Sequence, residues 1–503
     1  MRQAVNPRHR SHSILFASVG TIAERFAAIC RSDSTRVLIH SPATGDAWTA
    51  SDIWNACARF AEILRRSGLE AGDLVVSAAG NHPSIVALIL ACRELDLALL
   101  PLDGGTTVPE IRDLVDRFGA ASLLIPDEPA RDATDFGFAQ AVGFERDLTL
   151  LTRGSSKHAY VTAVLKLTSG STGSPRAALT TEAQLVADGL HIVAAMGIQP
   201  HDTQLAVIPV SHSYGLSVLV MPLLLQGTAI VLRESFIPPQ LSADARRFAA
   251  RVFPGVPFMF QYFLTNPPAG GWPPMLTQLI SAGAPLTPAT VRAFHDRFGV
   301  KIHSFYGSTE TGGIAFDEDD EVHDGVVVGR PMPGVTISLR QEPDIPDGAG
   351  RIHVRSDAVS SGYTGSTRDG FDDDGFMTGD YGGWDDAGRL TLLGRVSSFV
   401  NVAGRKVQPD EVEHVLRTMP GIADVRVVAA ADEQRGQQIV ACIVADRQGD
   451  GVTVLTVRQF CAARLAAYKV PRTIIFLDAI PLTARGKTDR SALDELVRAR
   501  LPV

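Results

Sequence analysis

The chain has 503 residues, of which 45% are hydrophobic and 20% are charged, so it is too long for one core and has the composition of a multidomain globular protein. The formal net charge of −8, without any long run of Lys or Arg, argues against nucleic acid or an anionic membrane surface as the main partner. The five cysteines are scattered and form no Cys-x-x-Cys pair, which favours a reduced cytoplasmic protein with buried thiols.

The first part of the chain alternates helical and strand patterns. Apolar residues at helical spacing begin after Thr49 and stop before Gly68, and a short buried strand follows at 73–79. The pattern repeats as helix 83–93, strand 97–102, helix 108–118 and strand 122–126. Such alternation is typical of βα units that build a parallel sheet covered by helices on both faces.

A stretch rich in Ser, Thr and Gly, residues 167–176, follows the apolar run 163–165. A loop of this composition after a strand can turn backbone N–H groups and hydroxyls toward a polyanion, and Arg176 adds a positive charge. The Walker A spacing is absent, and a plain flexible loop has the same composition. From the residues alone, a phosphate cradle and a flexible loop both stay open.

The chain continues with a second α/β layer. Residues 214–232 predict a buried helix, turn and strand rather than a membrane span, because Pro222 and Gly227 interrupt the apolar run. The other elements expected are helices 181–196, 288–298, 409–419 and 456–467, a strand leading into a turn at 279–286, and strands 204–209, 301–307, 336–339, 350–354, 389–393, 424–429, 438–445 and 473–477. We therefore predict an α/β fold: a large N-terminal domain of two α/β layers plus a small β unit (1–394), then a small mobile α+β C-terminal domain (395–503).

Four further motifs follow the Ser/Thr/Gly-rich stretch. They are His212-Ser213-Tyr214-Gly215, the segment from Tyr306 to Gly312, Thr378-Gly379-Asp380 and Arg485-Gly486-Lys487. Together and in this order they resemble the adenylate-forming superfamily, which contains acyl-CoA synthetases, aryl-CoA ligases, luciferases and the adenylation domains of peptide synthetases. The resemblance runs from about residue 20 to the end of the chain.

This resemblance implies that the chain activates a carboxylic acid with ATP and Mg²⁺. A carboxylate is a poor electrophile, so enzymes of the superfamily attach it to AMP, expel pyrophosphate and let a thiol attack the acyl-adenylate. The expected acceptor is CoA. Transfer to the phosphopantetheine thiol of a separate acyl carrier protein is the alternative, and a non-catalytic nucleotide-binding scaffold or sensor is a third reading.

The resemblance also assigns the nucleotide site. The loop would hold the β- and γ-phosphates, and the family usually has Lys where Arg176 stands. Tyr306 would lie against the adenine, Thr309 would contact the α-phosphate, Glu310 would hold Mg²⁺ and Asp380 would accept both ribose hydroxyls. The full set implied for the nucleotide is Thr168, Ser169, Gly170, Ser171, Thr172, Gly173, Arg176, Tyr306, Gly307, Ser308, Asp380 and Arg395.

Lys487 is the expected catalytic residue, together with Thr309 and Glu310, because a Lys in this loop would bridge the carboxylate and α-phosphate oxygens. The hinge is expected near Arg395 to Ser398, where Ser397 stands at a position that is commonly Asp or Lys in the family. The loop of Ala403, Gly404 and Arg405 would pass close to the pantetheine arm of CoA.

The acid pocket is the last part that the resemblance implies. Its expected lining residues are His212, Ser213, Tyr214, Ser281, Gly283, Ala284 and Phe305. Relatives that activate amino acids carry an Asp in the stretch where His212 stands, because a buried ammonium needs a partner. An aromatic or aliphatic acid without an α-amino group is therefore expected, while a packed core role for His212 stays open.

Overall fold

The computed structural model describes residues 20–127, 136–156, 159–168, 175–323, 327–342, 345, 348–365, 368–395, 400–402, 405–407, 409–432, 436–446, 451–465, 469–482 and 488–501. They form two compact units. The first unit is Met1–Val322, Pro331–Thr336 and Arg355–Phe376, and the second is His323–Arg330, Ile337–Val354 and Met377–Val503. The expected α/β fold is confirmed, and the domain boundary at residue 394 stays a prediction.

The first unit contains a seven-stranded sheet in the order β6-β7-β5-β3-β4-β8-β9. Its strands are β3 (Leu74–Ser77), β4 (Ala98–Pro101), β5 (Ser122–Pro126), β6 (Gln140–Glu145), β7 (Leu148–Thr152), β8 (Val164–Thr168) and β9 (Arg176–Thr180). The inner strands β5, β3, β4 and β8 are parallel, as the alternating pattern predicts. Both sides of the sheet differ from that prediction, because β7 runs antiparallel to β5 and to the edge strand β6, and the edge strand β9 runs antiparallel to β8.

Helices α2 (Ala50–Arg66), α3 (Ser84–Glu94) and α4 (Val108–Arg117) alternate with these strands. Helix α2 begins at a capping box, in which the Thr49 hydroxyl accepts from the Asp52 N–H and the Asp52 carboxylate accepts from the Thr49 N–H. Helix α3 is apolar all round, and every residue from Ser84 to Cys92 is buried. A helix of this composition belongs inside the core, and its residues join the largest hydrophobic cluster of the first unit.

A second layer in the first unit has the strand order β15-β14-β13-β12-β10-β11-β1-β2. Its strands are β1 (Val37–Ser41), β2 (Asp46–Thr49), β10 (Thr203–Ala206), β11 (Ala229–Leu232), β12 (Val252–Gly255), β13 (Gln278–Ser281), β14 (Ile302–Ser308) and β15 (Gly312–Phe316). Its helices are α1 (Ile22–Ser32), α5 (Glu182–Met196), α6 (Ser213–Gly215), a π-helix (Leu216–Val220), α7 (Met221–Gln226), α8 (Pro238–Arg247), α9 (Pro257–Thr265) and α10 (Pro288–Phe298). The predicted buried helix, turn and strand at 214–232 is confirmed.

The side chain of Asn81 ties these two layers together. Its amide nitrogen donates to the backbone carbonyls of Ile208 and Arg233, at 3.2 and 2.8 Å, and its oxygen accepts from the Val210 N–H at 2.8 Å. All three partners are backbone groups, so the amide fixes the path of the chain rather than one side chain. Because Val210 precedes His212 by two residues, Asn81 helps to position one of the predicted site motifs.

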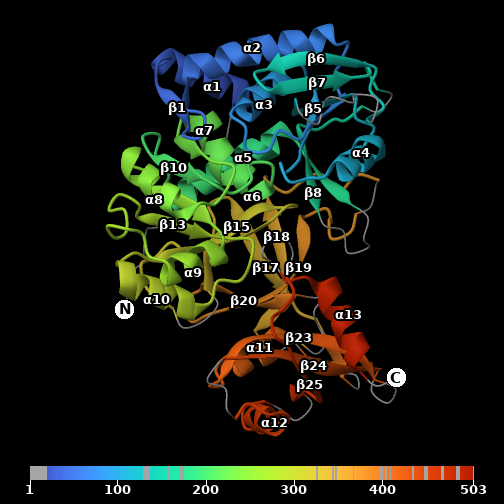
Figure 1. Ribbon diagram of the computed structural model, residues 1–503. Coiled ribbons are helices and arrows are strands. Elements are labelled where there is room, and N and C mark those ends of the chain that lie inside the picture. The colour runs from blue at the N-terminus through green and yellow to red at the C-terminus, as the bar shows by residue number, and fades with distance from the viewer. Residues whose placement is uncertain are drawn as a thin grey trace, which may run out of the picture. The chain divides into compact units, whose positions relative to one another are not determined.

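The second unit contains the strands β17-β18-β19-β20-β16 and a separate five-stranded sheet (Figure 1). The first group is β16 (Val327–Pro331), β17 (Val335–Arg340), β18 (Ala349–Ser356), β19 (Phe376–Trp384) and β20 (Leu390–Arg395). The five-stranded sheet is β21 (Val400–Val402), β22 (Arg405–Val407), β23 (Ile422–Asp432), β24 (Gly436–Ala445) and β25 (Thr473–Phe476), with helices α11 (Pro409–Arg417), α12 (Val454–Ala462) and α13 (Arg490–Arg500). The α+β character predicted for the tail is confirmed.

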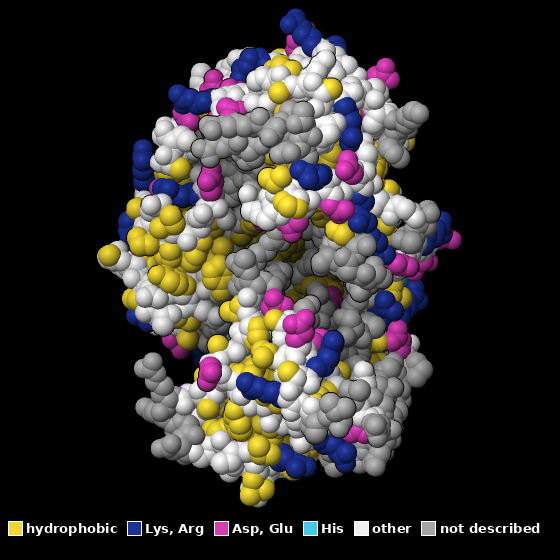
Figure 2. Space-filling view, turned by 45° about the vertical axis from the view of Figure 1, so that its right-hand side comes forward, with side chains coloured by type: hydrophobic (Ala, Val, Ile, Leu, Met, Phe, Trp, Pro, Cys, Tyr) yellow, Lys and Arg dark blue, Asp and Glu magenta, His cyan; other side chains and the backbone are white. Residues whose placement is uncertain are grey.

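Exposed aromatic side chains extend the core of the first unit to its surface. Phe258 and Tyr262 of α9 are 44% and 43% exposed, and both make edge contacts with the ring of Phe236. Figure 2 shows hydrophobic side chains gathered on the left of the face turned to the viewer. Among the described residues, no helix has the length and apolar character needed to cross a bilayer.

Candidate active site

The hairpin of β8 and β9 brings the two ends of the predicted phosphate loop together. Thr168 pairs with Arg176 across the hairpin, and the Thr168 hydroxyl donates to the Arg176 carbonyl at 3.3 Å. The loop residues Ser169, Gly170, Ser171, Thr172 and Gly173 lie outside the described residues. The structure therefore places the base of the loop at the edge of the seven-stranded sheet.

Arg176 is held by side chains from a distant part of the chain. Its Nη1 donates to Asp369 Oδ2 at 2.6 Å, although the two residues are 193 positions apart. Its guanidinium carbon lies 4.7 Å from the centroid of the Tyr363 ring, within cation–π distance. The fork of an arginine suits both contacts, since a planar cation can stack on a ring while one edge meets a carboxylate.

Thr309 and Glu310 lie in the turn between β14 and β15. Ser308 pairs with Gly312 at the end of this hairpin, and the Ser308 hydroxyl accepts from the Thr311 N–H at 3.2 Å. The Glu310 carbonyl accepts from the Ser360 N–H at 2.7 Å, which anchors the turn from outside. The motif that the sequence singles out is thus a short, well-bonded turn at the carboxyl end of β14.

The Glu310 carboxylate has one firm partner. Its Oε1 accepts from the Tyr363 hydroxyl at 2.7 Å. Burial raises the pKa of Tyr363, and the charge of Glu310 raises it further, so the phenol keeps its proton and donates. Burial lowers the pKa of Lys166 in β8, while the charges of Asp188 and Glu310 oppose that shift.

Asp188 of α5 fixes the other end of the turn. It is 2% exposed, and it accepts from the Ser217 hydroxyl at 2.5 Å and from the Gly313 N–H at 2.9 Å. Gly312 has a φ of +69°, and a Cβ placed there would lie 2.3 Å from Asp188 Oδ1. Only glycine satisfies both the backbone conformation and this close approach.

Replacing Gly312 by alanine is expected to lower the free energy of unfolding by about 3 kcal/mol or more, because the new Cβ strains the backbone and displaces buried Asp188. Activity should fall as well, since the turn carries Thr309 and Glu310. Urea titration and pyrophosphate release measure the two effects. Gly299→Ala is the matched control: its φ is +70° but no atom lies within 4 Å, so a loss of only about 1 kcal/mol is expected. Equal losses in both variants would contradict the role of the Asp188 contact.

The short helix α6 carries the predicted acid-pocket residues next to this turn. The Ser213 hydroxyl lies 3.4 Å from the Thr309 hydroxyl. The ring of Tyr214 lies 5.7 Å from that of Phe305, and its hydroxyl donates to the Ile280 carbonyl at 3.2 Å, next to Ser281 of β13. Burial raises the pKa of Tyr214 well above its usual range, so this hydroxyl stays neutral. Four of the predicted residues, Ser213, Thr309, Tyr214 and Phe305, are thus linked by contacts in the first unit, and Ser281 follows the Ile280 that Tyr214 contacts.

His212 has an acidic neighbour that the sequence did not predict. Its Nε2 lies 3.4 Å from Asp103 Oδ2, and the imidazole is about half exposed. The packed core role that stayed open for His212 is therefore wrong for this side chain. Gly283 and Ala284 follow β13, where Gly283 has a φ of +80°. These residues turn the chain at the carboxyl end of the strand.

Tyr306 and Gly307 lie in β14 of the first unit, where they pair with Ala315 and Gly313 of β15. The second unit holds the other predicted residues. Asp380 of β19 pairs with Arg395 of β20, so the two residues assigned to the ribose side are neighbours across one antiparallel ladder. Arg405 pairs with Val402 at the end of the hairpin of β21 and β22. Ala403, Gly404, Ser397 and Lys487 lie outside the described residues.

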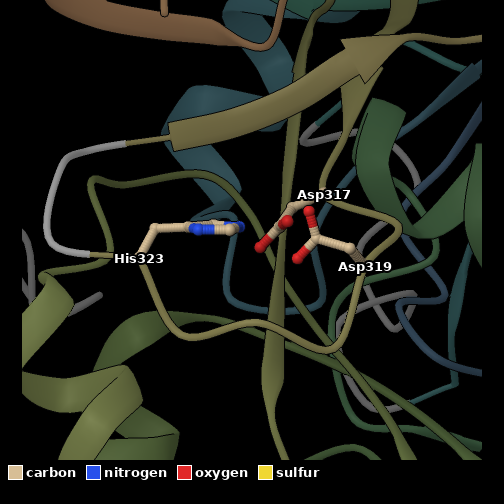
Figure 3. Close-up of side chains that lie close together, drawn as sticks. All are labelled: Asp317, Asp319 and His323. Atoms are coloured by element: carbon tan, nitrogen blue, oxygen red, sulfur yellow. The ribbon is translucent and has the colours of Figure 1, made fainter. Parts of the chain in front are cut away.

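An acidic group that could be taken for a metal site lies on the loop after β15. Figure 3 shows Asp317 and Asp319 with their carboxylates close together, and His323 follows on the same loop. The ammonium of Lys301 lies 3.0 Å from Asp317 Oδ2 and 3.0 Å from Asp319 Oδ1. Because this buried lysine already balances the carboxylates, the group is a structural ion-pair cluster.

Two family profiles match most of the chain. Residues 26–364 match the AMP-binding enzyme family, and residues 411–487 match the AMP-binding enzyme C-terminal domain. Among curated proteins, an oxalate–CoA ligase of Arabidopsis thaliana is 27% identical over 85% of this chain and 89% of its own. An indoleacetate–CoA ligase of Aromatoleum aromaticum is 28% identical over 87% of this chain and 91% of its own.

A solved structure has the same fold over nearly the whole chain. The crystal structure of ATP-bound MatB from Rhodopseudomonas palustris superposes with a TM-score of 0.81 at 26% identity, and the match covers 95% of this chain and 99% of the other. The similarity therefore includes both units and is not confined to the nucleotide motifs.

Proposed function

Because this chain belongs to the AMP-binding enzyme family and is an acid–thiol ligase, we propose that the site around Thr309 and Glu310 joins a carboxylic acid to AMP and passes the acyl group to CoA. The observation that carries this proposal is the 3.4 Å distance between the hydroxyls of Ser213 and Thr309. This contact places Thr309, which is assigned to the α-phosphate, beside Ser213, which is assigned to the acid pocket. Carboxylate and phosphate would meet there, as adenylation requires.

The residues of the turn suit Mg²⁺ and the triphosphate. Glu310 offers a carboxylate of which only Oε1 has a hydrogen-bond partner among the described residues, and Thr309 offers a neighbouring hydroxyl. Oxygen donors of this kind, one carboxylate plus phosphate oxygens, are the usual ligands of Mg²⁺ in nucleotide sites. When bound, the ion would neutralise charge on the phosphates. We assign Glu310 to the metal and Thr309 to the α-phosphate.

The remaining proposed roles fall on residues of the second unit. Asp380 and Arg395 would hold the ribose and the phosphate side, a role supported by their pairing across β19 and β20. Lys487 would carry the cation that bridges the acid carboxylate and the α-phosphate. Arg405 and its neighbours would meet the pantetheine arm in the second half-reaction. The hinge near Ser397 would allow the two half-reactions to use different faces of the C-terminal part.

The acid is proposed to be aromatic or aliphatic, without an α-amino group. Tyr214 and Phe305 supply aromatic walls, and the phenol of Tyr214 is neutral and already bonded to the Ile280 carbonyl. The carboxylate of Asp103 lies beside the residues assigned to the acid pocket, and it is paired with His212 at 3.4 Å. A substrate ammonium would therefore have to compete with an imidazole for this charge.

CoA is proposed as the acceptor, and a two-step assay tests this choice. Pyrophosphate release is first measured over aryl, short-chain and long-chain acids, and each active acid is then offered CoA or a panel of acyl carrier proteins. We expect acid-dependent pyrophosphate release followed by acyl-CoA formation. Acyl transfer to a carrier protein alone would favour the alternative acceptor. No pyrophosphate from any acid would favour a nucleotide-binding relative without catalysis.

A cytoplasmic location is proposed from the thiols. All five cysteines are free, and Cys57, Cys92, Cys442 and Cys461 are buried. Burial raises the pKa of each of these four thiols, to about 12 for Cys57 and Cys92 and about 11 for the other two. Protonated, buried thiols of this kind suit a reducing compartment.

A further inference from the structure

We propose that Tyr363 is a positioning residue for the metal ligand Glu310, and that Arg176 and Asp369 hold Tyr363 in place. The inference rests on the proposed function, because it takes Glu310 as the residue that binds Mg²⁺. All four side chains belong to the first unit. They form one continuous set of contacts from the exit of the phosphate loop to the metal turn.

The segment that carries Tyr363 holds the Glu310 turn at two points. The Tyr363 hydroxyl donates to Glu310 Oε1 at 2.7 Å, and the Ser360 N–H donates to the Glu310 carbonyl at 2.7 Å. One contact fixes the carboxylate and the other fixes the backbone beneath it. A hydrogen bond to a metal-binding carboxylate sets its orientation and leaves its other oxygen for the ion.

Tyr363 itself is buried and held by backbone pairing on both sides. It is 7% exposed, and its backbone forms an antiparallel bridge with Ala178 of β9. On either side of it, the Leu179 N–H donates to the Gly362 carbonyl at 2.8 Å and the Thr364 N–H donates to the Ala177 carbonyl at 2.9 Å. The segment 361–364 thus adds to the edge of β9, the strand that leads out of the phosphate loop.

The guanidinium of Arg176 lies over the ring of Tyr363. The guanidinium stacks at 4.7 Å, Asp369 holds it at 2.6 Å, and Phe371 meets the ring edge-on at 5.1 Å. A lysine at position 176, as is usual in the family, would keep the charge but lose the planar stack and the fork. Arg176 therefore makes two contacts, with Tyr363 and with Asp369, that a lysine at this position would not reproduce together.

The test measures how much Mg²⁺ improves ATP binding, without turnover. Isothermal titration gives the Kd of ATP in excess Mg²⁺ and in EDTA, with no acid present. The Mg²⁺ effect is the Kd of ATP in EDTA divided by the Kd in Mg²⁺. In Tyr363→Phe we expect this ratio to fall by about tenfold or more, the usual loss when a supporting hydrogen bond to a metal ligand is removed. Binding of ATP in EDTA should stay within about twofold, since the ring and its stack are kept.

Tyr160→Phe is the matched control. The Tyr160 hydroxyl also makes one half-buried hydrogen bond, to the Phe118 carbonyl at 2.8 Å, and it is not assigned to the site. This variant should keep the wild-type ratio. Arg176→Lys and Asp369→Asn leave Glu310 untouched and should each lower the ratio by a smaller factor, about two- to fivefold, because they loosen the tyrosine only indirectly.

The outcomes separate this inference from the proposed function. A wild-type ratio in Tyr363→Phe would overturn the positioning role, whatever the activity of the variant. A loss of ATP affinity in both Mg²⁺ and EDTA would assign Tyr363 to folding of the site, and would also overturn it. If the wild-type protein gains no ATP affinity from Mg²⁺, the proposed metal role of Glu310 fails first.

Discussion

Replacement of Lys487 by alanine is expected to lower the rate of acyl-adenylate formation by about 10²–10³-fold, because one preorganised donor at the developing charge is lost. Thioester formation from a preformed acyl-adenylate and CoA should stay close to the wild-type rate. In the proposed mechanism, Lys487 would be needed only while the carboxylate attacks the α-phosphate. Pyrophosphate exchange measures the first step, and release of AMP from synthetic acyl-adenylate measures the second.

Lys469→Ala is the control for this experiment. Lys469 is also a lysine of the region after residue 394, where its ammonium lies 2.6 Å from Glu411, and it is not assigned to the reaction. Its loss should change neither half-reaction by more than about twofold, as expected for a partly exposed ion pair. Equal loss of both half-reactions in Lys487→Ala would refute the division of labour between them.

Glu310→Gln is expected to lower acid-dependent pyrophosphate release by about 10²–10³-fold, since the charge that would bind Mg²⁺ is removed where phosphate charge develops. Glutamine has the same length, and its amide oxygen can still accept from Tyr363, so the turn should keep its shape. The unfolding free energy should therefore change little. Stopped assays of pyrophosphate over a range of Mg²⁺ concentrations measure the loss.

Glu318→Gln removes an equal charge from the exposed loop after β15 and should leave the rate unchanged. Recovery of the Glu310→Gln rate by high Mg²⁺ would be consistent with a weakened metal site. If Glu310→Gln keeps the wild-type rate at low Mg²⁺, then Glu310 has no role in the mechanism.

Local sequence patterns predicted the parts of the fold that depend on nearby residues. The strands and helices from α2 to β5 follow the apolar periodicity, and the predicted turn at Thr309 and Glu310 lies at the end of its strand. The antiparallel pairing of β7 and β9 was not predicted, because pairing direction depends on connections that periodicity does not record.

The partners of the site residues could not be predicted from the sequence either. Tyr363 lies 53 positions from Glu310, and Asp188 lies 125 positions from Gly313. A single sequence gives no signal for such pairs, and a tyrosine or an aspartate alone is compatible with many roles. Arg176 shows the same limit, since its departure from the family pattern was visible while its matching Asp369 was not.

The contact between Ser213 and Thr309 has a consequence for changes of substrate. Under the proposed function, acid choice and nucleotide chemistry would share this pair of hydroxyls, so a mutation at Ser213 is expected to alter turnover together with acid preference. The rings of Tyr214 and Phe305, which we assign to the acid pocket, lie 5.7 Å apart and take no part in that pair of hydroxyls. Divergence toward new acids, in nature or in the laboratory, should therefore accumulate at the aromatic wall while Ser213 is retained.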